Sequence, residues 1–155
     1  MSFEPDGTDL RVEVTKMRAP INLAYRPNTS DLYVTMNQRD DLGKATPGDW
    51  LAKVSVGQSW GFPDCYGQGG SVCDGVPKPT AVLDKHAAVS GLAFLGGSVY
   101  VAEWSSGKVL RVGLPSGKVS TFFTKAKNPE PLVAMGDGSL LVGDWSSGVV
   151  YRTHP

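Results

Sequence analysis

The chain has 155 residues, and its 15 basic and 15 acidic side chains give a formal net charge of zero. This balance carries no electrostatic signature of nucleic-acid or anionic-membrane binding, and no stretch approaches the roughly 20 apolar residues of a membrane-spanning helix. With 19 glycines and 11 prolines, the chain has little room for long helices, which excludes helical bundles and Rossmann-type folds and favours short strands joined by turns.

The beginning of the chain predicts a strand but no targeting segment. Residues 1–7 have neither the basic head nor the apolar run of a signal peptide. We therefore expect a cytosolic protein, or a mature or excised piece of a longer one. Residues 9–16 alternate in the manner of a short strand, Leu-Arg-Val-Glu-Val-Thr over 10–15.

A sequence pattern recurs three times along the chain. The segment Ser98–Gly107 returns as Ser139–Gly148, with a weaker copy at Asp31–Asn37. Upstream of each copy, a lysine precedes a leucine at the same spacing, in the pairs Lys16 and Leu23, Lys85 and Leu92, and Lys125 and Leu132. A period of about 40 residues is typical of β-propeller blades, each made of four antiparallel strands.

The second copy shows the four predicted strands most clearly, over Ser90–Phe94, Val99–Trp104, Val109–Gly113 and Val119–Phe123. Glycine-containing turns join them. The sequence therefore predicts an all-β, single-domain half-propeller of three blades. The predicted blades cover about 20–84 (with an insertion over 40–79), 88–124 and 129–155.

The third predicted blade has only three strands, whereas the N-terminal strand over 9–16 aligns with the outer strand of the second blade. Propellers typically need 4–8 blades to close a ring. We therefore expect a six-bladed homodimer in which each N-terminal strand completes the last blade of the partner. A larger or swapped assembly and a crippled gene fragment are the alternatives.

Several segments together resemble a known family. They are Tyr33–Gly43, Pro47–Asp49, Trp60–Gly67, Leu83–Phe94 and Tyr100–Trp104. These resemble the soluble sugar dehydrogenases that use pyrroloquinoline quinone (PQQ), namely the sorbosone and aldose sugar dehydrogenase-like proteins. The resemblance covers about the C-terminal half of such a protein. It implies a six-bladed propeller with PQQ and Ca²⁺ as cofactors.

The resemblance implies roles for some residues and leaves others unmatched. Arg18 matches the arginine of a family Arg-Asn pair, in which Ala19 replaces the asparagine. Arg39 is the second cation that this half could offer to the quinone. The family lysine falls on Ser105, and its paired arginines fall near Glu130.

Two further roles concern the calcium ion and the catalytic base. The family calcium loop would fall on Asn37–Asp41, with Asn37, Asp40 and Asp41 as candidate ligands, although the Gly-Pro of the family is not found at 38–39. One interpretation of this loop is a calcium site that also includes Asp49. The other interpretation is a polar loop that is simply solvated. A dehydrogenase also needs a general base, for which His86 is the internal candidate; the alternative is a loop histidine bonded to backbone.

The ends of the repeated strands carry a second set of candidates. Glu103 and Asp144 occupy equivalent positions, and Asn37, Trp104 and Trp145 follow at the next one. In a two-fold dimer the carboxylates and amides would supply the hard oxygen ligands that suit Ca²⁺. The alternative is that both acids accept hydrogen bonds from the serine turns that follow them. The tryptophans would either pack between blades or form a stacking platform for a sugar.

Cys65 and Cys73 have the wrong spacing for a zinc pair. We expect a local disulfide that staples the insertion and stabilises it by roughly 2–3 kcal/mol in the chain-entropy model. Such a bond would favour a periplasmic or secreted protein.

The sequence leaves three functions open. The first is a propeller scaffold that binds a small molecule, a sugar, a metal or a partner in its funnel without an intact catalytic set. The second is a PQQ-dependent sugar or aldehyde dehydrogenase in which His86 is the base and Arg18 contacts cofactor or substrate. The third is a gene fragment with no function.

Overall fold

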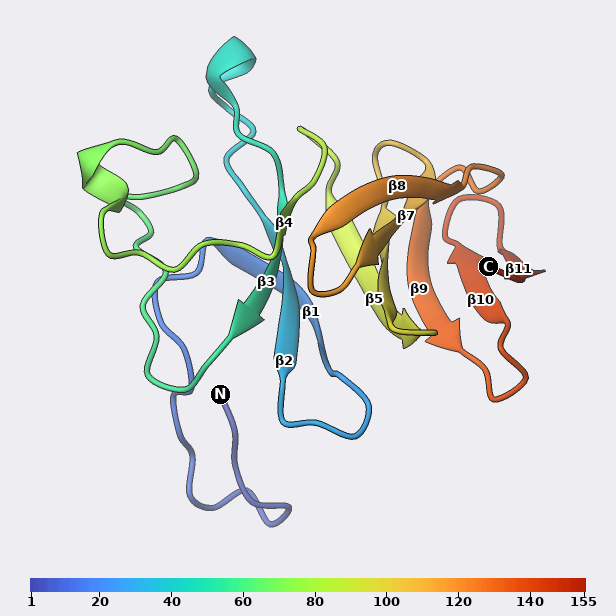
Figure 1. Cartoon of the computed structure of the whole chain (residues 1–155), viewed down its shortest axis with the longest axis horizontal. Coiled ribbons are helices and arrows are strands. Elements are labelled where there is room, and N and C mark those ends of the chain that lie inside the picture. The colour runs from blue at the N-terminus through green and yellow to red at the C-terminus, as the bar shows by residue number, and fades with distance from the viewer.

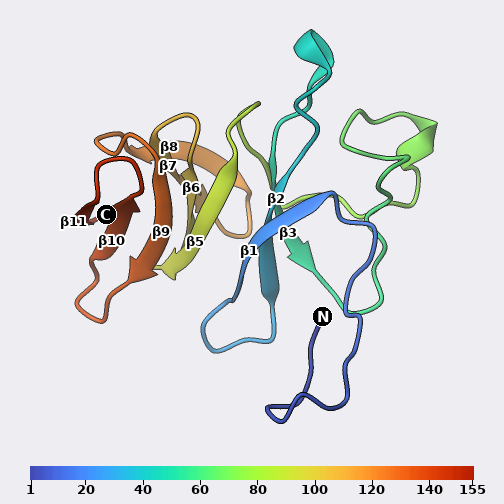
Figure 2. The same cartoon turned by 180° about the vertical axis from the view of Figure 1, so that it is seen from behind.

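The computed structural model describes residues 1–155 as eleven strands in three antiparallel sheets (Figures 1 and 2). The strands are β1 (Ala19–Tyr25), β2 (Leu32–Asn37), β3 (Trp50–Val54), β4 (Ala81–Val82), β5 (Val89–Leu95), β6 (Ser98–Glu103), β7 (Lys108–Gly113), β8 (Lys118–Phe123), β9 (Pro129–Ala134), β10 (Leu140–Asp144) and β11 (Val149–Thr153). The only helices are two short 3₁₀ turns, Gly43–Ala45 and Ser71–Cys73. Neither is long and apolar enough to span a membrane. The predicted all-β fold is confirmed.

The sheets follow one another in chain order, as propeller blades do. The first has the order β1-β2-β3-β4, the second β5-β6-β7-β8 and the third β9-β10-β11. The first strand of each sheet, β1, β5 or β9, lies against the first strand of the next sheet (Figure 2). These three first strands therefore lie next to one another along one side of the stack.

The strands form because their apolar residues alternate and their turns contain glycine. The β6–β7 hairpin turns at Gly107 and the β7–β8 hairpin at Gly117, with φ angles of 68° and 69°. Glycine adopts this left-handed conformation without the steric cost of a Cβ atom. In β6, Val99 and Val101 face the first sheet, while Tyr100 and Ala102 face the third.

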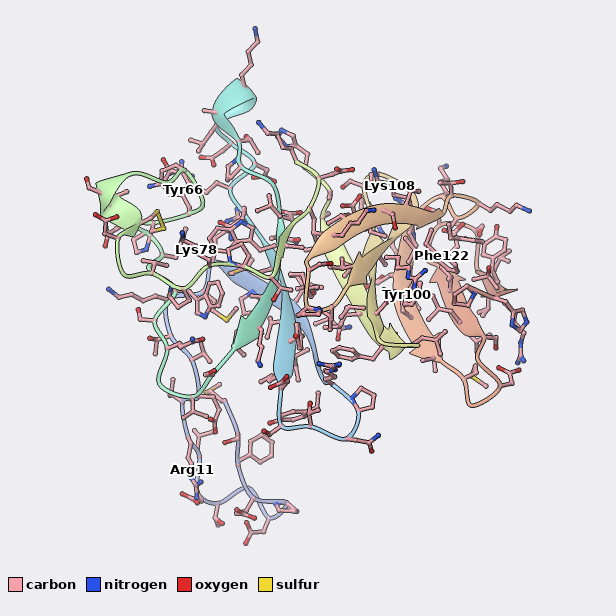
Figure 3. The ribbon with its side chains drawn as sticks, in the orientation of Figure 1. Arg11, Tyr66, Lys78, Tyr100, Lys108 and Phe122 are labelled. Atoms are coloured by element: carbon pink, nitrogen blue, oxygen red, sulfur yellow. A yellow bond between two sulfur atoms is a disulfide. The ribbon has the colours of Figure 1, made fainter.

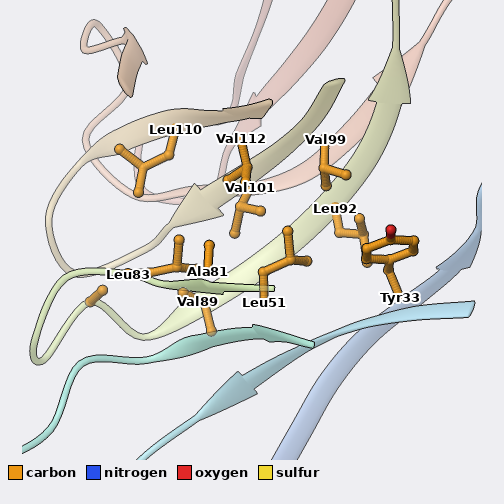
Figure 4. Packing of buried hydrophobic residues seen from close by; sticks show 11 residues of the cluster. Tyr33, Leu51, Ala81, Leu83, Val89, Leu92, Val99, Val101, Leu110 and Val112 are labelled. Atoms are coloured by element: carbon orange, nitrogen blue, oxygen red, sulfur yellow. The ribbon is translucent and has the colours of Figure 1, made fainter. Parts of the chain in front are cut away.

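Two apolar clusters hold the three sheets together. The first lies between the first and second sheets (Figure 4) and the other between the second and third. In the second cluster Tyr100 packs edge-on against Phe122 at a ring-centroid distance of 4.9 Å (Figure 3). The first cluster comprises Tyr33, Leu51, Ala81, Leu83, Ala87, Val89, Leu92, Val99, Val101, Leu110 and Val112.

The N-terminal segment covers part of the far side of the first sheet. Thr15 bonds through its backbone to Gln58 and Trp60, in a parallel bridge. Val14 and Met17 pack against the cluster on that side of the sheet. In the single chain, the strand expected over 9–16 forms isolated bridges only.

The insertion expected over 40–79 contains β3, because Trp50–Val54 forms the third strand of the first sheet. The additional residues therefore form two loops, one on each side of β3. The second loop carries the Cys65–Cys73 disulfide, which the structure confirms. This loop also walls an apolar pocket of about 270 Å³ that is lined by Trp50, Val76 and Pro77 among others.

Candidate functional site

A polar pocket of about 190 Å³ lies where the first sheet meets the loop that leads into the second. Its lining residues come from five segments of the chain. They are Arg18, Asn37, Gln38, Asp40, Asp49, His86, Ala88 and Ser105. The structure therefore brings together five residues that the sequence pointed to, namely Arg18, Asn37, Asp40, Asp49 and His86.

The strand ends explain why these side chains meet. Arg18 directly precedes β1 and Asn37 ends β2, and these antiparallel neighbours place Ala19 opposite Asn37. Arg18 Nη1 donates to the Asn37 carbonyl oxygen at 3.4 Å, and Nη2 lies 3.8 Å from Asp40 Oδ1. The guanidinium therefore adds positive charge to the wall of the pocket.

Asp49 joins the two sides of the pocket. Its carboxylate accepts hydrogen bonds from the backbone N–H groups of Gln38, at 2.7 Å, and Val89, at 3.4 Å. Gln38 follows β2 and Val89 begins β5, so one buried side chain links the first two sheets. Burial raises the pKa of this carboxyl, and the hydrogen bonds oppose the rise.

Two buried oxygen atoms in the pocket wall have no hydrogen-bond partner in the protein. They are Asn37 Oδ1 and Gln38 Oε1. Gln38 is 2% exposed, and a buried polar atom without a partner costs about 1–3 kcal/mol. Both residues line the pocket together with Asp40 and Asp49, so the side chains gathered here are of the amide and carboxylate types that a hard cation prefers.

The loop that carries His86 has an unusual backbone. His86 and Ala88 have φ angles of 54° and 50°, in the left-handed region that non-glycine residues seldom adopt. The loop is held from the second sheet, because the N–H groups of Trp104 and Ser105 donate to the carbonyl oxygens of Ala88 and Ala87. This arrangement places His86 at the pocket with a fixed backbone.

Arg39 and Asp41 lie outside the pocket lining. Arg39 makes two hydrogen bonds to the Asp41 carboxylate, at 2.9 and 2.6 Å, and this pair lowers the Asp41 pKa to about 2. The guanidinium also lies 5.0 Å from the ring centre of Tyr66, beside the disulfide (Figure 3). Arg39 therefore connects the site loop to the insertion in this structure.

Glu103 ends β6 and Asp144 ends β10, in different sheets, and no three acidic, histidine or cysteine side chains gather in a metal-binding group. Asp144 accepts hydrogen bonds from the backbone of Lys127 and Asn128 and from the Ser147 hydroxyl, and the backbone bonds lower its pKa to about 2. Glu103 accepts from Ser106 and from the Asp84 N–H. Both acids thus make the serine-turn contacts of the alternative interpretation, and their calcium role across a dimer stays a prediction.

Trp104 and Trp145 form a tilted pair with ring centres 5.9 Å apart, on the turns after β6 and β10. Trp145 therefore packs on Trp104 across the two blades. Because it is 68% exposed, it also presents ring surface to solvent. Neither tryptophan lines the polar pocket.

Gln38 and Ser105 were not predicted as site residues. Their signal is positional, because Gln38 directly follows Asn37 and Ser105 directly follows Trp104, two predicted residues at strand ends. Asp49 was expected in a calcium loop with Asp40 and Asp41; Asp40 and Asp49 line the pocket, and Asp41 does not.

No family model matches the chain, and no curated protein matches it. Solved structures do. The PQQ-bound aldose sugar dehydrogenase of Streptomyces coelicolor is 20% identical with a TM-score of 0.74, over 97% of this chain and 46% of that one. The apo-form of the soluble aldose sugar dehydrogenase of Escherichia coli is 17% identical with a TM-score of 0.74, over 98% and 49%.

A calcium structure of a Trichoderma reesei carbohydrate-active enzyme of family AA12 is also similar, at 13% identity and a TM-score of 0.70, over 88% of this chain and 52% of that one. The chain thus spans about half the length of the structures that it matches. At these identities the likeness concerns the fold.

Proposed function

Because the chain has the fold of about half of a PQQ-dependent sugar dehydrogenase, we propose that it is a propeller scaffold whose polar pocket binds Ca²⁺ together with a small anionic molecule. The observation that carries this proposal is the pair of unpartnered oxygens, Asn37 Oδ1 and Gln38 Oε1, in the pocket wall.

The chemistry of the pocket suits a hard cation. Ca²⁺ prefers carboxylate and amide oxygens in flexible arrangements, and Asn37, Gln38, Asp40 and Asp49 supply them. A bound cation would satisfy the two amide oxygens and favour the ionised form of Asp49. With two carboxylates in the set, we expect weak Ca²⁺ binding, with a dissociation constant of about 0.1–1 mM, the range of extracellular calcium modules.

The anion would contact Arg18 and the cation. Arg18 is the one permanent cation in the lining, and its side chain is 27% exposed in the pocket wall. Ser105 and His86 add hydrogen-bonding groups to the lining. This donor set suits a molecule with one carboxylate and neighbouring hydroxyls, such as a sugar acid.

PQQ itself does not fit the residues of this chain alone. The quinone carries three carboxylates, whereas the lining holds one guanidinium. Arg39 is committed to Asp41 and Tyr66, and Glu130 stands near the positions where the family arginines would fall.

The second candidate function is a sugar dehydrogenase in which the missing cations come from elsewhere. His86 favours it, because this imidazole lines the pocket and an imidazole can accept the proton of a substrate hydroxyl near neutral pH. Dye reduction with aldoses, PQQ and Ca²⁺ measures this activity, and its loss in His86→Ala would support the candidate. Without turnover on any aldose, the dehydrogenase candidate is rejected and the binding scaffold stands.

Calorimetric titration with Ca²⁺ alone tests the proposed function. Gln38→Leu removes an unpartnered oxygen from the pocket, so we expect Ca²⁺ binding to weaken at least tenfold while the calcium-free protein gains about 1 kcal/mol of stability. Thr46→Val is the matched control, because Thr46 Oγ1 is also buried without a partner but does not line the pocket. Equal Ca²⁺ affinity in both variants and the parent would reject the proposal.

A further inference from the structure

The first and second sheets pack together in the same way as the second and third sheets do. In the second sheet, the pair Leu92 and Val101 faces the first sheet, and the pair Ala93 and Tyr100 faces the third. Each sheet thus has two different apolar faces. We call the face toward the preceding sheet in the chain the backward face, and the face toward the following sheet the forward face. The forward face of one sheet covers the backward face of the next. Leu132 and Val142 of the third sheet repeat the backward pair.

The same two faces are open in part at the ends of the stack: the N-terminal segment covers the side of the first sheet that carries Val34, whereas the side chains of β1 on that face stay exposed. At the first sheet, Leu23 is the equivalent of Leu92, and it is 63% exposed beside its cross-strand partner Val34. At the third sheet, Val133 is the equivalent of Ala93 and is 51% exposed beside Leu141. Val150, on the same side of the third sheet, is 67% exposed.

Two strand edges are open in the same places. Residues 13–16 use one edge to bond with residues 57–62, whereas the backbone groups of Val12 and Val14 make no hydrogen bond. β11 is bonded to β10 on one side and to nothing on the other. An open edge is a template for pairing with another chain.

We infer that two copies of this chain assemble into one closed ring, in which the first sheet of each copy covers the third sheet of the other. In this ring, residues 10–14 of each copy would add a strand to β11 of its partner. A second copy fits better than an unrelated protein because one chain carries both halves of the contact: the forward face and the backward face, and both open edges.

The ring also bears on the proposed pocket. Arg18 directly precedes β1, the strand that the partner's third sheet would cover, so this pocket residue lies next to the inferred interface. A face-to-tail contact of this kind makes a ring if its rotation closes and a filament if it does not.

Size-exclusion chromatography with light scattering tests the ring. We expect a single species of twice the 16.5 kDa chain mass. A folded monomer would overturn the inference, and so would a continuous series of polymers, because the first means that the faces stay uncovered and the second that two copies do not close.

Variants test whether the assembly uses these faces. Val133→Asp places a charge on the forward face, and we expect a folded monomer, with circular dichroism as the check on folding. Val72→Asp is the control, because Val72 is similarly exposed, at 50%, but lies on the disulfide loop. A dimer that survives Val133→Asp would reject this interface.

A mixing experiment keeps the test decisive. Leu23→Lys is expected to be monomeric for the same reason as Val133→Asp. An equimolar mixture of the two proteins should regain the two-chain mass, because one contact would pair Lys with Asp and the other would remain unaltered. If the mixture stays monomeric, the predicted pairing of these faces is wrong.

Discussion

At the scale of single residues, Glu103 and Asp144 occupy the same place in the repeat but differ in electrostatics. Burial raises the pKa of Glu103, whereas backbone hydrogen bonds lower that of Asp144 to about 2. Charged Asp144 therefore stabilises the fold above the ordinary carboxyl pKa, near 4. This contribution is lost as the pH falls from about 4 toward 2.

We predict that Asp144→Asn lowers the melting temperature at pH 7 more than Glu103→Gln does. The amide introduced by Glu103→Gln mimics the protonated acid that burial favours, and it keeps an acceptor for the Asp84 N–H. The deficit of Asp144→Asn should shrink as the pH falls toward 2, and thermal unfolding between pH 2 and 7 measures it. Asp74→Asn serves as the control on an exposed carboxylate in the disulfide loop. A pH-independent deficit in Asp144→Asn would contradict the hydrogen-bond account.

At the scale of elements, the close approach of β5 and β9 is set by a glycine. A methyl group at Gly91 would overlap with the carbonyl oxygen of Glu130, whereas at Gly136 it would meet no atom within 4 Å. We predict that Gly91→Ala destabilises the protein by about 3 kcal/mol, since overpacking against backbone cannot be relieved by a rotamer change. Gly136→Ala should unfold at the same denaturant concentration as the parent. Equal midpoints for both variants would show that the sheets can move apart at no cost.

The disulfide loop is a second element whose contribution can be measured. Cys65 and Cys73 close a short loop, which in the chain-entropy model is worth about 2–3 kcal/mol. We predict that the double variant Cys65→Ser, Cys73→Ser loses this amount in chemical denaturation, and that a reducing agent lowers the stability of the parent but not of the variant. If reduction leaves the parent unchanged, the insertion holds its shape through the Arg39–Tyr66 contact and its packing instead.

Some elements of the fold could be predicted from the sequence and others could not. Alternation within Ser98–Glu103 and its copies was enough to predict the strands and the blades. The course of the N-terminal segment was not predictable, because its parallel bonds to residues 57–62 leave no pattern in either segment. The contact between Arg39 and Tyr66 was not predictable for the same reason, since Tyr66 approaches only when the insertion folds back.

At the scale of the whole molecule, the repeat implies both the fold and its incompleteness. Arg18, Asn37, Asp40 and His86 were each selected from position or resemblance, and the fold gathers them in one pocket. Asp49 was expected near Asp40, but its hydrogen bonds to the backbone of Gln38 and Val89, across two loops, are contacts that spacing does not reveal. The chain covers about half of the structures that it resembles, and its uncovered faces lie at the two ends of the stack.

Native mass spectrometry of the chain in a calcium-containing volatile buffer examines the ring and the pocket at once, because one spectrum reports chain number and bound ions together. We expect two chains with two Ca²⁺ ions, and two chains without calcium after the Gln38→Leu substitution. Two chains with no calcium in the parent would reject the pocket and keep the ring. A single folded chain that binds no calcium would contradict both.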